Sequence, residues 1–296
     1  MIWFIEFKIQ RLVGKDDRKI SGMDKNCYKV FLNKTKYLFI GIICIIITFT
    51  ISLNKEQNFS PRIVVMGDSI VANYEENNTG VVNYLEGILE EDVFNAAFGG
   101  SSVVNNNLNR YETQGEDSLS FEKLVDGILS KDFTPQYAAV NKINAPKGYA
   151  ERLYALATIN FAELDYLVLE GGINDFALQS KIDDFYRVYK DKVSKIQKEY
   201  PNLKIIMVSL SYSYLKYNDD IIYCEDDKFY TYTLSEYVEK MRLIAKELEI
   251  DFVDRYNTII TKDNINQYSL DGIHLNEAGR KLLAQEIAEK ILKDYK

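Results

Sequence analysis

The sequence predicts an α/β fold in which helices cover both faces of a parallel sheet. From residue 62 to the last residues, short apolar runs that fit buried strands alternate with longer segments of helical spacing. The chain is 47% hydrophobic and 27% charged, the composition of a folded protein. Strands separated by helices indicate a parallel sheet, because a parallel connection has to cross over the sheet between one strand and the next.

The predicted elements follow one another in a regular order. We expect strands at 62–66, 93–97, 166–170, 204–210 and 251–253, and helices at 80–90, 121–129, 149–164, 182–200, 234–248 and 276–292. Two irregular stretches interrupt this order, 103–120, rich in Asn, and 211–233, rich in Tyr and Asp. Long loops in compact domains are usually functional or mobile, so both stretches are candidates for contact with a substrate.

The N-terminal part of the chain differs from the rest in charge. Residues 1–53 hold nine basic and four acidic side chains, and the whole chain has a net charge of −8, so residues 54–296 carry −13. Residues 37–53 form an uncharged apolar run that follows Lys34 and Lys36. At about 1.5 Å per residue, such a helix is just long enough to span the hydrocarbon core of a bilayer.

The charges around this run predict its orientation. Basic residues mark the cytoplasmic side, so we expect a basic cytoplasmic segment at 1–36, a transmembrane signal-anchor at 37–53, a linker at 54–60 and an extracytoplasmic domain at 61–296. A cleaved signal peptide is the alternative, although 50–52 (Thr-Ile-Ser) makes a poor cleavage site. A chain that starts at Met23 would itself form a compact signal-anchor.

Charge and cysteine usage exclude other classes of protein. The acidic body repels phosphate backbones, so it does not bind nucleic acid. Of the three cysteines only Cys224 lies in the body, which leaves it without an internal disulfide or a cysteine metal cluster. The frequent use of Lys, Ile, Asn and Tyr suits a bacterial protein at an exposed cell wall.

The first predicted strand ends at a serine. In open parallel sheets, chemistry collects at the C-terminal ends of the strands. Here Gly67, Asp68 and Ser69 follow the strand, and glycine permits a sharp turn that brings the serine hydroxyl and its own amide to that edge. A helix N-cap is the alternative interpretation, because Asp and Ser are favoured at that position.

Two further strand ends carry hydrogen-bond donors. After the second strand, Gly99 and Gly100 allow a backbone N–H to point into a cleft. After the third, Asn174 in the segment 171–175 (GGIND) offers a side-chain amide. Donors of these two kinds form oxyanion holes, although each segment alone is equally compatible with a plain turn.

The single histidine lies near the end of the chain, in 271–279 (DGIHLNEAG). A separation of three residues allows the Asp271 carboxylate to accept from one ring nitrogen of His274 while the other faces outward. Such an arrangement sets the tautomer and leaves a base whose ordinary pKa is about 6.5. The alternative is a half-buried or solvated histidine without a catalytic role.

Taken together, these segments resemble the four sequence blocks of the SGNH (GDSL-type) hydrolases: GDSI at 67–70, NAAFGG at 95–100, GGIND and DGIHLNEAG. The resemblance covers about 62–292 and implies a flavodoxin-like three-layer α/β/α sandwich with five parallel strands. Ile70 stands where the family usually has leucine, and Gly99 could replace Gly100. Carried over residue by residue, the family pattern implies a catalytic triad of Ser69, Asp271 and His274, and an oxyanion hole formed by Ser69, Gly100 and Asn174.

The resemblance also implies an activity. It predicts a serine esterase that acts through an acyl-serine intermediate, without metal or organic cofactor. With the predicted anchor, its substrates are expected to be small-molecule or glycan esters, with small acyl groups on cell-surface carbohydrate or lipid-like compounds. One alternative is an acyltransferase that passes the acyl group to a glycan hydroxyl with the same triad. Another is a catalytically idle carbohydrate-binding module, in which the tyrosines of 211–232 stack on sugar rings.

Overall fold

The computed structural model describes residues 61–105, 118–142, 148–217 and 220–293. All of these residues belong to a single compact unit. The predicted cytoplasmic segment, transmembrane helix and linker therefore lie outside the described residues. Within the described ranges, no helix is both long and apolar enough to cross a bilayer.

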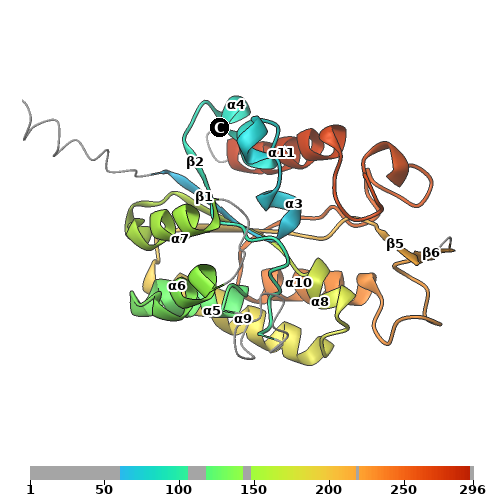
Figure 1. Ribbon diagram of the computed structural model, residues 1–296, viewed down its shortest axis with the longest axis horizontal. Helices are drawn as coiled ribbons and strands as arrows, with labels where there is room; N and C mark the ends of the chain where they lie inside the picture. The colour runs from blue at the N-terminus through green and yellow to red at the C-terminus, as the bar shows by residue number, and fades with distance from the viewer. Residues whose placement is uncertain (1–60, 106–117, 143–147, 218–219, 294–296) are drawn as a thin grey trace, which may run out of the picture. The chain divides into compact units, whose positions relative to one another are not determined.

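Five parallel strands form the sheet at the centre of Figure 1. Their spatial order is β2-β1-β3-β4-β7. Their bounds are β1 Ile63–Met66, β2 Val93–Asn95, β3 Tyr166–Glu170, β4 Lys204–Val208 and β7 Asp251–Val253. All five were predicted, and most residues in them are apolar and buried. β1 lies between β2 and β3, so the chain passes from β1 to the neighbouring strand on one side and then crosses to the neighbouring strand on the other side. This reversal opens a crevice at the C-terminal ends of β1 and β3, where open α/β sheets bind ligands.

Helices cover both faces of the sheet and complete the predicted three-layer sandwich. On one face α4 (Val81–Leu89) packs against α11 (Glu277–Leu292), and on the other α9 (Ile182–Glu199) packs between α5 (Phe121–Ser130) and α10 (Leu234–Glu247) (Figure 1). The remaining helices are α3 (Ser69–Ala72), α6 (Thr134–Lys142), α7 (Tyr149–Thr158) and α8 (Ile173–Ala177). A flavodoxin-like arrangement of five parallel strands between two helical layers is thereby confirmed.

The predicted helix over 149–164 is wrong in its second half. Helix α7 ends at Thr158, and a short 3₁₀ turn at Phe161–Glu163 leads into β3. The break falls at Asn160, whose side chain accepts a hydrogen bond from Ala162 N. Asparagine competes with helical backbone bonds in this way, and the β-branched residues before it weaken the helix further.

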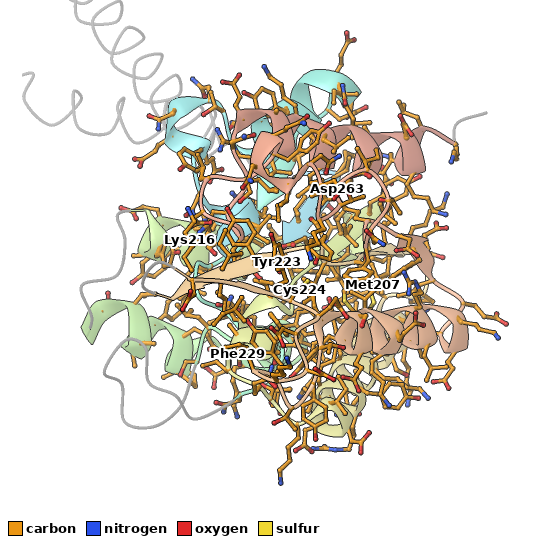
Figure 2. The ribbon with its side chains drawn as sticks, turned by 90° about the vertical axis from the view of Figure 1, so that its right-hand side faces the viewer. Met207, Lys216, Tyr223, Cys224, Phe229 and Asp263 are labelled. Carbon is orange, nitrogen blue, oxygen red and sulfur yellow. The ribbon has the colours of Figure 1, made fainter. Side chains whose placement is uncertain are left out.

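The predicted irregular stretch over 211–233 contains an antiparallel hairpin. Strand β5 (Tyr214–Tyr217) pairs with β6 (Asp220–Tyr223), and Tyr214 lies opposite Tyr223. Figure 2 looks toward this hairpin and labels Tyr223 beside the buried Cys224. The tyrosines of 211–223 that pack there do so against one another, since Tyr212 and Tyr214 are buried and both rings contact that of Tyr223. These ring contacts stabilise the hairpin. Rings buried in this way have a packing role and are not placed to stack on sugar rings.

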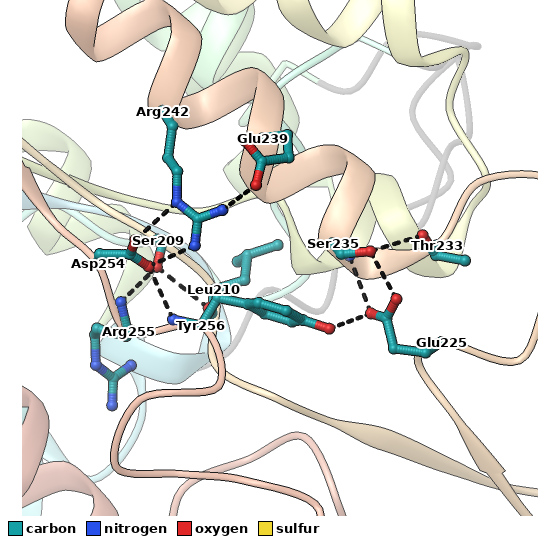
Figure 3. Close-up of polar contacts among 10 residues, drawn as sticks. All are labelled: Ser209, Leu210, Glu225, Thr233, Ser235, Glu239, Arg242, Asp254, Arg255 and Tyr256. Carbon is teal, nitrogen blue, oxygen red and sulfur yellow. Dashed lines mark hydrogen bonds and ion pairs between the residues drawn. The ribbon is translucent and has the colours of Figure 1, made fainter.

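Polar contacts hold the segment that leaves β7 against its neighbours (Figure 3). Asp254 accepts two hydrogen bonds from the guanidinium of Arg242 on α10, at 2.7 and 2.9 Å. The backbone N–H of Arg255 donates to Ser209 Oγ beyond β4, at 2.7 Å. This anchored segment begins the long connection to α11, which includes the only histidine of the chain.

Candidate active site

Ser69 lies at the C-terminal end of β1, as predicted. The turn is tight, since a Cβ on Gly67 would lie 2.6 Å from the carbonyl oxygen of Glu170. Asp68 is the N-cap of α3, and its side chain accepts from Ile70 N at 3.0 Å. The capping role thus belongs to the aspartate, while Ser69 becomes the first residue of the helix and keeps its hydroxyl for another partner.

That partner is His274, and the three predicted triad residues are in contact. Ser69 Oγ donates to His274 Nε2 over 3.0 Å, and His274 Nδ1 donates to Asp271 Oδ2 over 2.7 Å. A proton on Nδ1 leaves Nε2 as an acceptor, the tautomer that a general base for the serine requires. The chain of bonds can therefore move the serine proton to the imidazole.

Asp271 is held in its ionised form. Burial opposes the charge, but hydrogen bonds from the His274 ring and from the backbone amides of Ile273 and His274 outweigh it and keep the pKa of Asp271 below its ordinary value. The two carboxylate oxygens have different partners: Oδ1 accepts hydrogen bonds from the two backbone amides, and Oδ2 accepts one from the imidazole ring. The loop conformation and the imidazole orientation are thus set by one side chain.

The loop that carries Asp271 and His274 is packed against the hairpin. Gly272 has a φ of +98°, and a Cβ there would lie 2.5 Å from ring atoms of Tyr214. The backbone N–H of Tyr214 donates to Gly272 O at 3.0 Å, and its hydroxyl donates to Asn266 Oδ1 at 2.8 Å. Tyr214 therefore holds this loop from two sides, a role with no signature in the sequence.

The predicted backbone donors occupy the loop after β2. The N–H of Gly99 donates to the hydroxyl of Tyr149 over 2.5 Å, which commits it within the protein. Gly100 has a φ of +78°, and its N–H meets no hydrogen-bond acceptor among the described residues. The geometry favours Gly100 over Gly99 as the oxyanion donor.

Asn174 reaches the same loop from the start of α8. Its Nδ2 donates to Ser101 O over 2.8 Å, which fixes the orientation of the amide. A side-chain amide is the second kind of donor from which oxyanion holes are built. Asn174 thus bonds the loop that includes Gly100, and the same loop approaches Ser69 at Gly99. The roles of Ser69, Gly100 and Asn174 in catalysis remain predictions.

Two buried acids beside the site were missed in the sequence. Asp175 follows Asn174 and accepts the backbone N–H groups of Val103 and Val104, at 2.7 and 3.1 Å, while burial raises its pKa to about 7. Glu170 ends β3, and burial, with a smaller contribution from Asp68, raises its pKa well above the ordinary value, whereas Arg255 opposes that rise. The sequence held a signal for each of them: Glu170 directly follows an apolar strand segment, and Asp175 directly follows a predicted site residue.

Residues 106–117 of the stretch 103–120 lie outside the described residues. Among the residues that are described, no group of three His, Cys, Asp or Glu side chains is placed to hold a metal ion.

A serine at a strand end of a three-layer α/β/α sandwich, in contact with a histidine that contacts an aspartate, is the arrangement found in serine hydrolases. Residues 65–282 match the GDSL-like lipase/acylhydrolase family, and the chain belongs to that family. It is accordingly an enzyme that acts on ester bonds through a serine, and the resemblance found in the four sequence blocks is confirmed.

Several solved structures are similar to this chain at low sequence identity. One has a TM-score of 0.55 at 18% identity and covers 79% of this chain and 97% of its own. A member of the lipolytic protein G-D-S-L family from Veillonella parvula has a TM-score of 0.46 at 19% identity, with coverage of 77% and 96%. An acetyl xylan esterase has a TM-score of 0.48 at 16% identity, with coverage of 77% and 99%. No curated protein matches the chain.

Proposed function

We propose that this protein is a membrane-anchored, extracytoplasmic serine esterase that removes small acyl groups, acetyl among them, from cell-surface carbohydrate or lipid-like esters. The observation that carries the proposal is the continuous hydrogen-bonded chain from Ser69 through His274 to Asp271. No other histidine exists in the sequence to serve as the base.

Acylation begins when Ser69 Oγ attacks the ester carbonyl. His274 Nε2 takes the serine proton, and the ionised Asp271 stabilises the imidazolium that forms. The carbonyl oxygen gains negative charge, which the N–H groups of Ser69 and Gly100 and the amide of Asn174 are placed to bind. His274 then protonates the leaving alkoxide, the alcohol departs, and the acyl group stays on Ser69.

Deacylation repeats these steps with water. His274 takes a proton from water as its oxygen attacks the acyl carbon, the same three donors bind the oxyanion, and the proton returns to Ser69 Oγ. Hydrolysis therefore regenerates the free enzyme and releases a carboxylic acid.

The size of a neighbouring recess supports small acyl groups. Ile70, Ile173 and Ile273, each next in sequence to a proposed catalytic residue, line a recess of about 10 Å³ together with the base of the hairpin. A water molecule needs roughly 10–15 Å³ by the same measure. A recess of that size has room for a group no larger than about one water molecule and none for a long acyl chain.

Location rests on the sequence. The uncharged run at 37–53, preceded by Lys34 and Lys36, supports an anchor with the N-terminus inside and residues 61–296 outside. If the full chain is expressed in bacterial cells, it should remain with membranes after alkaline carbonate washing and be digested by protease added outside. Recovery in the soluble cytoplasmic fraction would contradict the anchor.

The activity is tested with the full chain in detergent. Acetyl, butyryl and palmitoyl p-nitrophenyl esters and an acetylated glycan are compared, and the rate should fall as the acyl chain lengthens. Ser69→Ala and His274→Ala should each lower kcat by about 10⁴-fold or more, because either change stops proton transfer from the nucleophile.

A surface substitution provides the control. Tyr154→Phe, on an exposed part of α7, should leave kcat unchanged. Wild-type activity in His274→Ala would sink the proposal, since no second imidazole can substitute. A fluorophosphonate should label Ser69 in the wild type, and failure to label it would favour an idle module on the same fold.

A further inference from the structure

The first turn of α7 contacts the loop that carries the proposed oxyanion donor. Tyr149 and Arg152 lie three residues apart and so share one face of the helix. The hydroxyl of Tyr149 accepts the N–H of Gly99 over 2.5 Å, and Nη1 of Arg152 donates to the carbonyl oxygen of Ala97. One helical face thus holds the loop at two points.

Arg152 also contacts a second group of side chains, which includes Glu75 and Asn95. Its Nη2 pairs with Glu75 Oε2 at 2.5 Å, and the same carboxylate oxygen accepts from Asn95 Nδ2 at 3.0 Å. Asn95 Oδ1 in turn accepts the N–H of Ala97 at 3.0 Å. Ala97 is therefore held at both its N–H and its C=O by one connected set of side chains.

Tyr149 is buried directly against the loop and close to the nucleophile. Its ring meets that of Phe98 edge to face, with centroids 5.3 Å apart, and the Arg152 guanidinium lies 5.6 Å from its centroid. The position that a Cβ on Gly99 would take lies 2.6 Å from the Tyr149 hydroxyl oxygen and 3.6 Å from Ser69 Cβ. The Tyr149 hydroxyl therefore lies near the point where the loop passes Ser69.

We propose that Tyr149 and Arg152 are positioning residues that hold the loop so that the Gly100 N–H faces the developing oxyanion. This inference rests on the proposed esterase function and deepens it. Two adjacent glycines leave the backbone with many accessible conformations, and Gly100 adopts a φ of +78°. Donors stabilise an oxyanion most when they are oriented before the charge appears. The bond from Gly99 to Tyr149 supplies that orientation and also explains why Gly100, rather than Gly99, is left to donate.

Tyr149→Phe in the full chain tests the inference, with Tyr154→Phe on the same helix as the matched control. Removing the hydroxyl should lower kcat about ten- to hundredfold and leave KM unchanged, because the loop contacts the transition state more strongly than the bound ester. A boronic acid, which forms a tetrahedral adduct on the serine, should bind more weakly by the same factor. The pH at half-maximal kcat/KM should not move, since the Tyr149 hydroxyl bonds Gly99 whereas the imidazole bonds Ser69 and Asp271.

A second variant guards against loss of folding. Arg152→Lys keeps the positive charge but loses the planar fork, and it should lower kcat and boronate affinity together while KM stays constant. Melting temperatures are measured for every variant. A reduced kcat with unchanged boronate affinity, or one explained by a matching fraction of unfolded protein, would overturn the positioning role.

The outcomes also separate this inference from the proposed function. If wild-type protein shows no hydrolysis that depends on Ser69, the esterase proposal fails and the positioning role fails with it. If hydrolysis depends on Ser69 but Tyr149→Phe matches the wild type in kcat and boronate affinity, only the positioning role is wrong.

Discussion

The two halves of the site are built in different ways. On the oxyanion side, Asn174 is 8% exposed and Asp175 is fully buried, and both extend directly from the end of β3. On the acid–base side, the side chains of His274 and Asp271 are 37% and 52% exposed, and they belong to a loop that does not continue directly from a strand of the central sheet. The first half takes its position from the sheet, whereas the second depends on local hydrogen bonds and on the hairpin.

This difference shows where each half is vulnerable. Buried strand ends move little, so a substitution there removes a chemical group and leaves its surroundings in place. The exposed loop is stabilised by the Asp271 turn and by Tyr214, so a change in backbone shape there should displace the imidazole. The predictions below separate loss of a group from loss of a position.

Asn174→Ala should have the largest effect. It removes one oxyanion donor, which typically lowers kcat by about 10²–10³-fold with little change in KM. Steady-state kinetics on p-nitrophenyl acetate measures the loss. Asn160→Ala, the same change at the cap of a short 3₁₀ turn, should leave kcat unaltered. If both variants lose activity equally, the amide of Asn174 plays no part in the chemistry.

Gly272→Ala tests the exposed half through its backbone. With a φ of +98° and Tyr214 only 2.5 Å from the new Cβ, the loop has to shift. We expect kcat/KM to fall about tenfold and the free energy of unfolding to fall by about 1–3 kcal/mol. Gly87→Ala, where a Cβ meets nothing within 4 Å on helix α4, should not reduce either quantity. Unchanged activity in Gly272→Ala would show that the loop does not need the hairpin for its position.

Asp175→Asn should produce the smallest effect, a change in the pH dependence of stability. In the unfolded chain the pKa of an aspartate is about 3.9, whereas burial raises that of Asp175 to about 7. Between these values the native state keeps a proton that the unfolded state has lost, so the free energy of unfolding falls as the pH rises. Asparagine cannot ionise and lacks this fall.

The measurement compares the two proteins by urea denaturation at pH 5 and pH 8. The stability of the wild type relative to Asp175→Asn should drop by about 2 kcal/mol between them. Curves that stay parallel would mean that Asp175 is already ionised at pH 5. In that case the buried half of the site would carry a permanent negative charge beside the oxyanion donors.

Much of the fold was predictable because its signals are local. The strand over 166–170 was predicted to the residue, since a short apolar run between turn residues is compatible with few structures other than a buried strand. The hairpin at Tyr214–Tyr223 was not, because its tyrosines mix with acids and its rings pack against distant elements. Helix α6 was also missed, since its sequence has little amphipathic spacing and places Pro135 near its start.

The sequence alone determined which segments form the strands, their succession along the chain and the four segments from which the family could be recognised, because each depends on neighbouring residues. The tertiary structure decided which of those segments meet. Ser69 and His274 are 205 residues apart, and only the assembly of the sheet and the packing of α11 bring Ser69 Oγ and His274 Nε2 to 3.0 Å. It also decided between Gly99 and Gly100, through a tyrosine 50 residues away. Such contacts depend on how distant elements pack, and no local pattern of residues encodes them.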